Sequence, residues 1–123
     1  MRVTLSKSFR FESAHFLPEL PEGHKCKRLH GHSFEVEIFV AGPMDPDLGW
    51  LVDYQVIKDA VGPIIDELDH RLLNTIDGLE NPTSENLAIW IWDRVAPRMR
   101  ILKRVSVKET CTTRCDYDGP DDD

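Results

Sequence analysis

The sequence predicts an α+β domain in which a small antiparallel sheet carries two helices on one face. Two segments with alternating apolar residues come first, two with helical spacing follow, and one alternating segment comes last. The expected order of elements is therefore β, β, α, α, β. The chain has 123 residues, 41% hydrophobic and 30% charged, which fits one folded domain with its own core.

Three segments alternate as half-buried strands do. Residues 3–15 share one parity at Val3, Leu5, Phe9 and Phe11. Lys7 interrupts that face, so we expect an edge or a bend there. Residues 30–40 repeat the pattern with Phe34, Val36, Ile38 and Val40, and residues 102–111 place Val105 and Val107 on an inner face.

Two segments carry an apolar stripe at helical spacing. Residues 54–68 follow Asp53, a good N-cap, and contain Gly62-Pro63, which can kink a helix. A second helix starts after a cap at Thr83 or Ser84, with a stripe formed by Leu87, Ala88, Ile91, Trp92 and Val95.

The remaining segments are polar or rich in proline and glycine. Residues 16–29, the turn-rich stretch after residue 41, and residues 69–82 are predicted as loops, which could hide a further short strand. We expect one domain over residues 1–115 and an acidic, disordered tail over residues 116–123. Such a small sheet has open edges that need a cover or a second subunit.

Composition excludes several classes of function. Fifteen Lys and Arg against 22 Asp and Glu give a net charge of −7, which argues against direct nucleic-acid binding. No apolar run reaches the roughly 20 residues that cross a bilayer, so we expect no membrane insertion. The first ten residues do not resemble a signal peptide, and three cysteines suit a reducing compartment. We therefore expect a cytoplasmic protein.

Histidines give the strongest chemical signal. In an extended chain His30 and His32 project to one side, in phase with Phe34, and His15 ends the first strand in phase with Phe11. Three imidazoles with an open fourth position are typical of catalytic zinc. The alternative is that a His-x-His pair occurs by chance and holds no metal.

Other candidates are weaker on local sequence alone. Cys26 lies among Lys25, Lys27 and Arg28, and cations favour the thiolate, yet the local sequence alone favours an ordinary loop thiol. Asp69 and His70 could form a proton-transfer pair, but adjacent side chains rarely point together, so the sequence alone favours a helix-end cation beside a solvated acid. Cys111 and Cys115 have no functional interpretation beyond ordinary thiols.

Glu109 shares parity with Val105 and Val107, which places a carboxylate on the inner face of the last strand. A buried acid needs donors, and a ring with an N–H/NH2 edge would supply two of them to its two oxygens. The alternative is an ion pair with a structural Arg or Lys.

Six stretches together resemble the 6-pyruvoyl-tetrahydropterin synthase family, and within it the bacterial 6-carboxy-tetrahydropterin synthase branch. They are Phe11-Glu12-Ser13-Ala14-His15, Pro21-Glu22-Gly23-His24-Lys25-Cys26 with His30-Gly31-His32, Gly49-Trp50-Leu51-Val52-Asp53, Leu68-Asp69-His70, Gly78-Leu79-Glu80-Asn81-Pro82-Thr83-Ser84-Glu85, and Val107-Lys108-Glu109-Thr110. The match covers nearly the whole chain except the acidic tail.

The resemblance implies a tunnelling fold, in which subunits join their sheets into a barrel, commonly as a homohexamer with sites between subunits. It makes His15, His30 and His32 zinc ligands, Cys26 a general base with Asp69 and His70 as proton-transfer partners, and Glu109 the pterin anchor. The implied reaction converts 7,8-dihydroneopterin triphosphate to 6-carboxytetrahydropterin, acetaldehyde and triphosphate, a step toward queuosine. Lys25, Lys27 and Arg28 are candidate triphosphate contacts.

Two alternatives stay open at this point. The sister synthase makes 6-pyruvoyl-tetrahydropterin and keeps the side chain. The three residues between Cys26 and His30 resemble the spacing of the carboxy-forming branch instead. A non-catalytic zinc- or pterin-binding module is the other alternative, and the set of Cys26, Asp69 and His70 argues against it.

Overall fold

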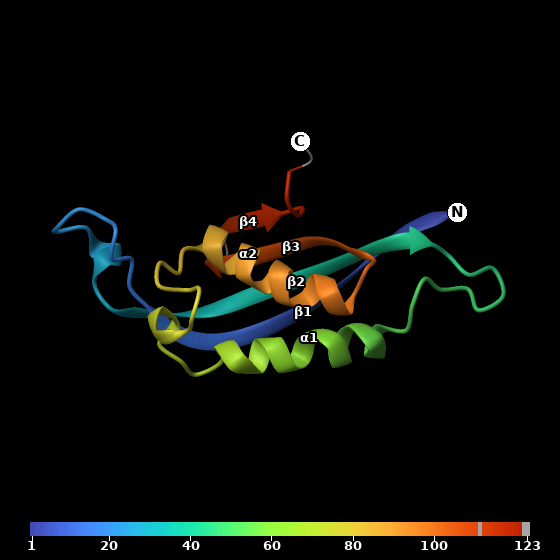
Figure 1. Ribbon diagram of the computed structural model, residues 1–123, viewed down its shortest axis with the longest axis horizontal. Coiled ribbons are helices and arrows are strands. Elements are labelled where there is room, and N and C mark those ends of the chain that lie inside the picture. The colour runs from blue at the N-terminus through green and yellow to red at the C-terminus, as the bar shows by residue number, and fades with distance from the viewer. Residues whose placement is uncertain (111, 122–123) are drawn as a thin grey trace.

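A computed structural model describes residues 1–110 and 112–121, with the side chain of residue 110 left out. Within these residues the chain forms four strands and two α-helices (Figure 1). The elements are β1 (Arg2–His15), β2 (His30–Pro43), α1 (Tyr54–Leu68), α2 (Ser84–Val95), β3 (Leu102–Thr110) and β4 (Thr113–Tyr117). The strands pair antiparallel in the order β1-β2-β3-β4.

One face of this sheet forms the core together with both described α-helices, as the α+β pattern predicted (Figure 1). Phe11 stacks on Phe34 of the neighbouring strand, with ring centroids 4.8 Å apart. The buried side chains of β2 and β3 continue this layer, and α1 and α2 cover it. They are Phe34, Val36, Ile38, Val40, Val105 and Val107 from the strands, and Ile57, Val61, Ile64, Ile65, Leu68, Leu87, Ala88, Trp90, Ile91 and Val95 from the helices.

β1 and β2 form one ladder that runs without a register shift from Arg2↔Pro43 to His15↔His30. β2 is therefore three residues longer than predicted. Lys7 lies within this ladder on a strand at the edge of the sheet, which is one of the two alternatives expected for it.

The helices begin where the sequence predicted. The Asp53 carboxylate accepts a hydrogen bond from the Gln55 amide at 2.9 Å, and α1 accommodates Pro63. The Thr83 hydroxyl accepts from the Asn86 amide at 3.1 Å and caps α2. The predicted stripe of α2 packs against the core, with Trp92 half-buried beside Tyr117, and Trp90, which the pattern did not include, is buried as well.

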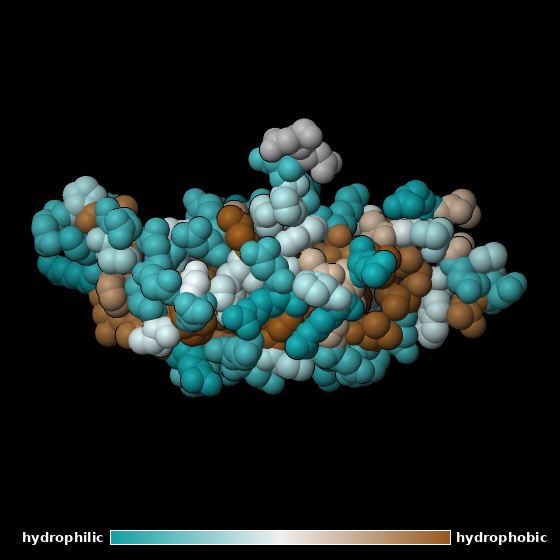
Figure 2. Space-filling model, in the orientation of Figure 1, coloured by the Kyte–Doolittle hydropathy of each residue, from teal (hydrophilic) through white to brown (hydrophobic). Residues whose placement is uncertain are grey.

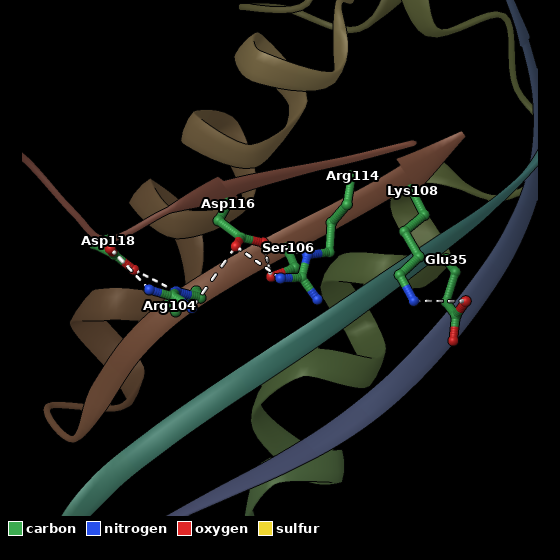
Figure 3. A network of polar contacts seen from close by, with 7 residues as sticks. All are labelled: Glu35, Arg104, Ser106, Lys108, Arg114, Asp116 and Asp118. Carbon is green, nitrogen blue, oxygen red and sulfur yellow. Dashed lines mark hydrogen bonds and ion pairs between the residues drawn. The ribbon is translucent and has the colours of Figure 1, made fainter. Parts of the chain in front are cut away.

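The predicted start of the acidic tail at residue 116 is wrong. Residues 116 and 117 lie in β4, where Asp116 pairs with Ser106. Figure 3 shows why acidic residues are ordered here: Arg104 donates from Nε and Nη2 to the two oxygens of Asp118, at 2.6 and 3.1 Å, and Arg114 contacts Asp116 at 2.9 Å. Pairing with β3, packing of Cys115 and Tyr117 on the core and these charge pairs place the segment on the sheet, and composition alone reveals none of them.

The ends of the sheet differ in character. β1 ends, β2 begins and β3 ends at one end, beside the loop that joins β1 to β2 (Figure 1). The opposite end carries the connection to α1, where hydrophobic side chains reach the surface (Figure 2); Leu48, Trp50, Tyr54 and Val56 are exposed there. Among the described residues no helix has the length and apolar character to cross a bilayer.

Candidate functional site

Three imidazoles meet at the end of the sheet where β1 passes into β2. His15 pairs directly with His30 across the ladder, and His32 lies two residues along β2 on the same face. The ring centroids are 4.6 Å apart for His15 and His30, 5.1 Å for His15 and His32, and 4.8 Å for His30 and His32. One nitrogen from each ring lies within 4.8 Å of those of the other two. The alternation in the sequence predicted this convergence.

Backbone carbonyls orient two of these rings. His15 Nδ1 donates to the Pro82 carbonyl at 2.9 Å, and His30 Nδ1 donates to the Arg28 carbonyl at 2.7 Å. A carbonyl only accepts, so each ring carries its proton on Nδ1 and keeps a lone pair on Nε2. Metal-binding histidines commonly have such an outer partner.

The free lone pair of His15 is buried. His15 is fully buried, and its Nε2 has no hydrogen-bond partner within the described residues. An unpaired buried nitrogen is costly unless another group binds it. A divalent cation shared with His30 and His32 would satisfy it, so the donor set fits a metal ion.

Burial favours the neutral form of His15 and His32. Removal from water lowers the pKa of His15 and of His32 from the ordinary value of 6.5. The Glu109 charge opposes this effect in both rings, and the hydrogen bond to Pro82 opposes it in His15. Neutral imidazole is the form that binds metal, so the site is prepared to take a cation at neutral pH.

A cavity of about 520 Å³ opens beside the histidines. It is lined by Lys25, Cys26, His30, His32, Glu109 and Thr113. The Glu109 carboxylate is half-buried, with Oε2 4.0 Å from His32 Nε2 and Oε1 accepting from the Ser84 hydroxyl at 3.3 Å. The predicted inward position of Glu109 is therefore confirmed, and within the described residues its carboxylate contacts Ser84 and His32 rather than an Arg or Lys. The sequence predicts Ser84 only as a helix cap, and no pattern in it links Ser84 to Glu109.

Asp69 and His70 lie elsewhere on the chain and do not line this cavity. Asp69 Oδ1 lies 3.0 Å from His70 Nδ1 and also accepts from the Glu12 amide at 2.9 Å. These hydrogen bonds, the one from Glu12 first, lower the pKa of Asp69. The His70 side chain is 78% exposed. Adjacent side chains do meet here, because His70 adopts a left-handed backbone with φ of 56°.

A family model described as 6-pyruvoyl tetrahydropterin synthase matches residues 4–120. The chain belongs to this family. The 6-pyruvoyl tetrahydropterin synthase family also accounts for the resemblance seen in the sequence, and the histidine cluster is consistent with the metal site of that family.

Similar proteins within the family carry different names. The chain is 42% identical to a 6-carboxy-5,6,7,8-tetrahydropterin synthase of Synechocystis sp., over 93% of this chain and 92% of that protein. It is 36% identical to a dihydroneopterin monophosphate aldolase of Pyrococcus furiosus, over 89% and 91%. The 6-pyruvoyl tetrahydropterin synthase structure of Caenorhabditis elegans superposes with a TM-score of 0.90 at 26% identity, covering 98% of this chain and 97% of that one. Family membership therefore leaves the reaction to be decided.

Proposed function

We propose that this protein is a 6-carboxy-5,6,7,8-tetrahydropterin synthase. It would convert 7,8-dihydroneopterin triphosphate and water to 6-carboxytetrahydropterin, acetaldehyde and triphosphate, in the cytoplasm and on the route to queuosine. One observation carries the proposal: a single cavity joins the imidazole cluster, the Cys26 thiol and the Glu109 carboxylate. The 42% identity to a synthase of that name supports the choice among family members.

Glu109 is the proposed anchor for the pterin ring. Its carboxylate lines the cavity, and a pterin presents adjacent N–H and NH2 donors that match the two oxygens of a carboxylate. Ser84, the first residue of α2, donates to one oxygen and so restricts how the carboxylate turns. The ring would then lie with its side chain toward the histidines.

His15, His30 and His32 are the proposed ligands of Zn²⁺, which would supply Lewis acidity toward side-chain oxygens of the substrate. Cys26 would then take a proton from the carbon beside such an oxygen. Its place on the cavity wall with His30 brings the thiol near the same region of the substrate. Lys25 lines the cavity too and is the favoured triphosphate contact, because Lys27 Nζ is 2.7 Å from Glu22.

The Asp69–His70 pair is proposed to serve the site of another subunit. Within one chain it contacts Glu12, three residues before His15, which places it about 10 Å along β1 from the cluster. The exposed His70 ring is available to a neighbouring chain. The edges β1 and β4 of the sheet offer surfaces for that assembly, for which we propose the barrel-forming homohexamer of the family.

Product analysis tests the assignment. Purified protein with 7,8-dihydroneopterin triphosphate should yield acetaldehyde, triphosphate and 6-carboxytetrahydropterin, identified by mass spectrometry, with zinc content measured on the same sample. Cys26→Ala should retain zinc and lose turnover. 6-Pyruvoyl-tetrahydropterin without acetaldehyde would assign the sister reaction. Consumption of dihydroneopterin monophosphate alone would favour the aldolase, and zinc binding with no turnover of either compound would indicate a binding module.

A further inference from the structure

The backbone around Cys26 is held from two sides. Cys26 lies in a 3-10 turn over Lys25–Lys27, and its carbonyl accepts from the Leu17 amide at 2.9 Å. Its own amide donates to His24 Nδ1 at 3.1 Å. The first contact is made by backbone alone. The second depends on a side chain, so it is the one that a substitution can remove.

His24 acts as the N-cap of this turn. Its backbone is extended, with φ of −69° and ψ of 131°, and its ring accepts from the amide two residues ahead, as Ser, Thr, Asp or Asn usually do at such a position. Its own amide donates to the Pro21 carbonyl at 3.1 Å, which fixes the backbone from which the ring extends. Because Nδ1 accepts, the ring carries its proton on Nε2 in this arrangement.

We propose that His24 is a positioning residue for Cys26: its ring fixes the turn that presents the thiol to the cavity. The inference rests on the proposed role of Cys26 in proton transfer. His24 itself is exposed and does not line the cavity, so it acts through Cys26 rather than on substrate. A short turn has little packing of its own, and small displacements of a catalytic group lower rates steeply.

A second contact on the same loop provides the control. Lys27 Nζ and Glu22 Oε1 are 2.7 Å apart, but the Glu22 side chain is 91% exposed. An exposed ion pair contributes little to stability. Glu22→Gln therefore changes a loop contact next to the turn while it leaves the Cys26 amide bonded.

The test compares His24→Ala, His24→Asn and Glu22→Gln. His24→Ala should lower kcat about five- to tenfold, the effect of losing one hydrogen bond, with KM for the pterin triphosphate within about twofold and zinc content unchanged. His24→Asn should restore most of kcat, because its amide oxygen accepts from the same N–H. Glu22→Gln should keep the kcat of the unsubstituted protein.

A second readout needs no turnover. Alkylation of Cys26 by iodoacetamide, followed by mass spectrometry of its peptide, should be more than twofold faster in His24→Ala and normal in His24→Asn. This result would support the positioning role even if the protein made no carboxytetrahydropterin. Unchanged alkylation and kcat in His24→Ala would overturn it, and so would an Asn variant as impaired as the Ala variant.

Discussion

His15 combines full burial with an unpaired nitrogen, and this combination has a consequence for stability in the metal-free protein. Burial lowers the pKa of His15 and of His32 below 6.5, whereas both titrate normally once unfolded. As the pH falls through 6.5, the unfolded state takes up protons that the folded state does not. The free energy of unfolding therefore decreases with falling pH until the lowered pKa values are reached.

This dependence can be measured by denaturant unfolding of chelator-treated protein between pH 7.5 and pH 5, the range in which histidine titrates. We expect His15→Gln to show a shallower slope than the unsubstituted protein, by at most about 1.4 kcal/mol per pH unit. Saturating zinc should make the dependence steeper, because the bound rings stay neutral in the folded protein while the histidines of the unfolded chain still take up protons. Equal slopes of unfolding free energy against pH in the two metal-free proteins would contradict the lowered pKa of His15 in the folded state.

Asp69 and His70 mark a limit of sequence reasoning at the same scale. Neighbouring residues in regular structure diverge, so the sequence favoured a helix-end cation beside a solvated acid. His70 adopts a left-handed backbone, and its amide donates to the Glu12 carbonyl at 2.6 Å. This conformation turns the His70 ring back to Asp69. The contact with Glu12 is 58 residues distant in sequence, and nothing local encodes it. Such conformations are costly for a non-glycine residue and are often found at functional positions.

At the scale of elements, the start of α2 serves the site in three ways. Pro82 accepts from His15, Thr83 caps the helix, and Ser84 donates to Glu109. We expect Thr83→Ala to lower the free energy of unfolding by about 1 kcal/mol, because the Asn86 amide loses its acceptor. Thr83→Ser keeps the hydroxyl and should stay close to the original stability in the same denaturant titration. An equal loss in both variants would show that the methyl group, and not the cap, is what matters.

The helices and the first two strands could be predicted because period, caps and apolar stripes agree along each segment. The histidine cluster followed from the same alternation, since parity and register decide which side chains share a face. β4 could not be predicted in this way. It pairs with β3, packs Cys115 and Tyr117 on the core, and places Asp116 and Asp118 beside Arg104 and Arg114, whereas the local composition indicates only an acidic segment. Cys111 lies outside the described residues, and Cys115 is half-buried on β4, where burial raises its pKa.

At the scale of the molecule, one chain holds two parts of the proposed chemistry at different places. The histidines, Cys26 and Glu109 surround the cavity, and Asp69 with His70 contacts the outer side of β1. The sheet ends in β1 and β4, and a small domain gains buried surface from assembly. A symmetric oligomer would give every site its missing pair from a neighbouring chain.

Mixing two inactive variants tests this division. Cys26→Ala and His70→Ala each remove one part, so each alone should be nearly inactive. If a site takes Cys26 from one chain and His70 from another, random assembly from equal amounts leaves both residues intact in about one quarter of the sites. Co-expressed or co-refolded variants should then regain about a quarter of the original turnover, measured as acetaldehyde release. If Cys26 and His70 of the same chain work together, every site keeps one defect and the mixture stays as inactive as its components.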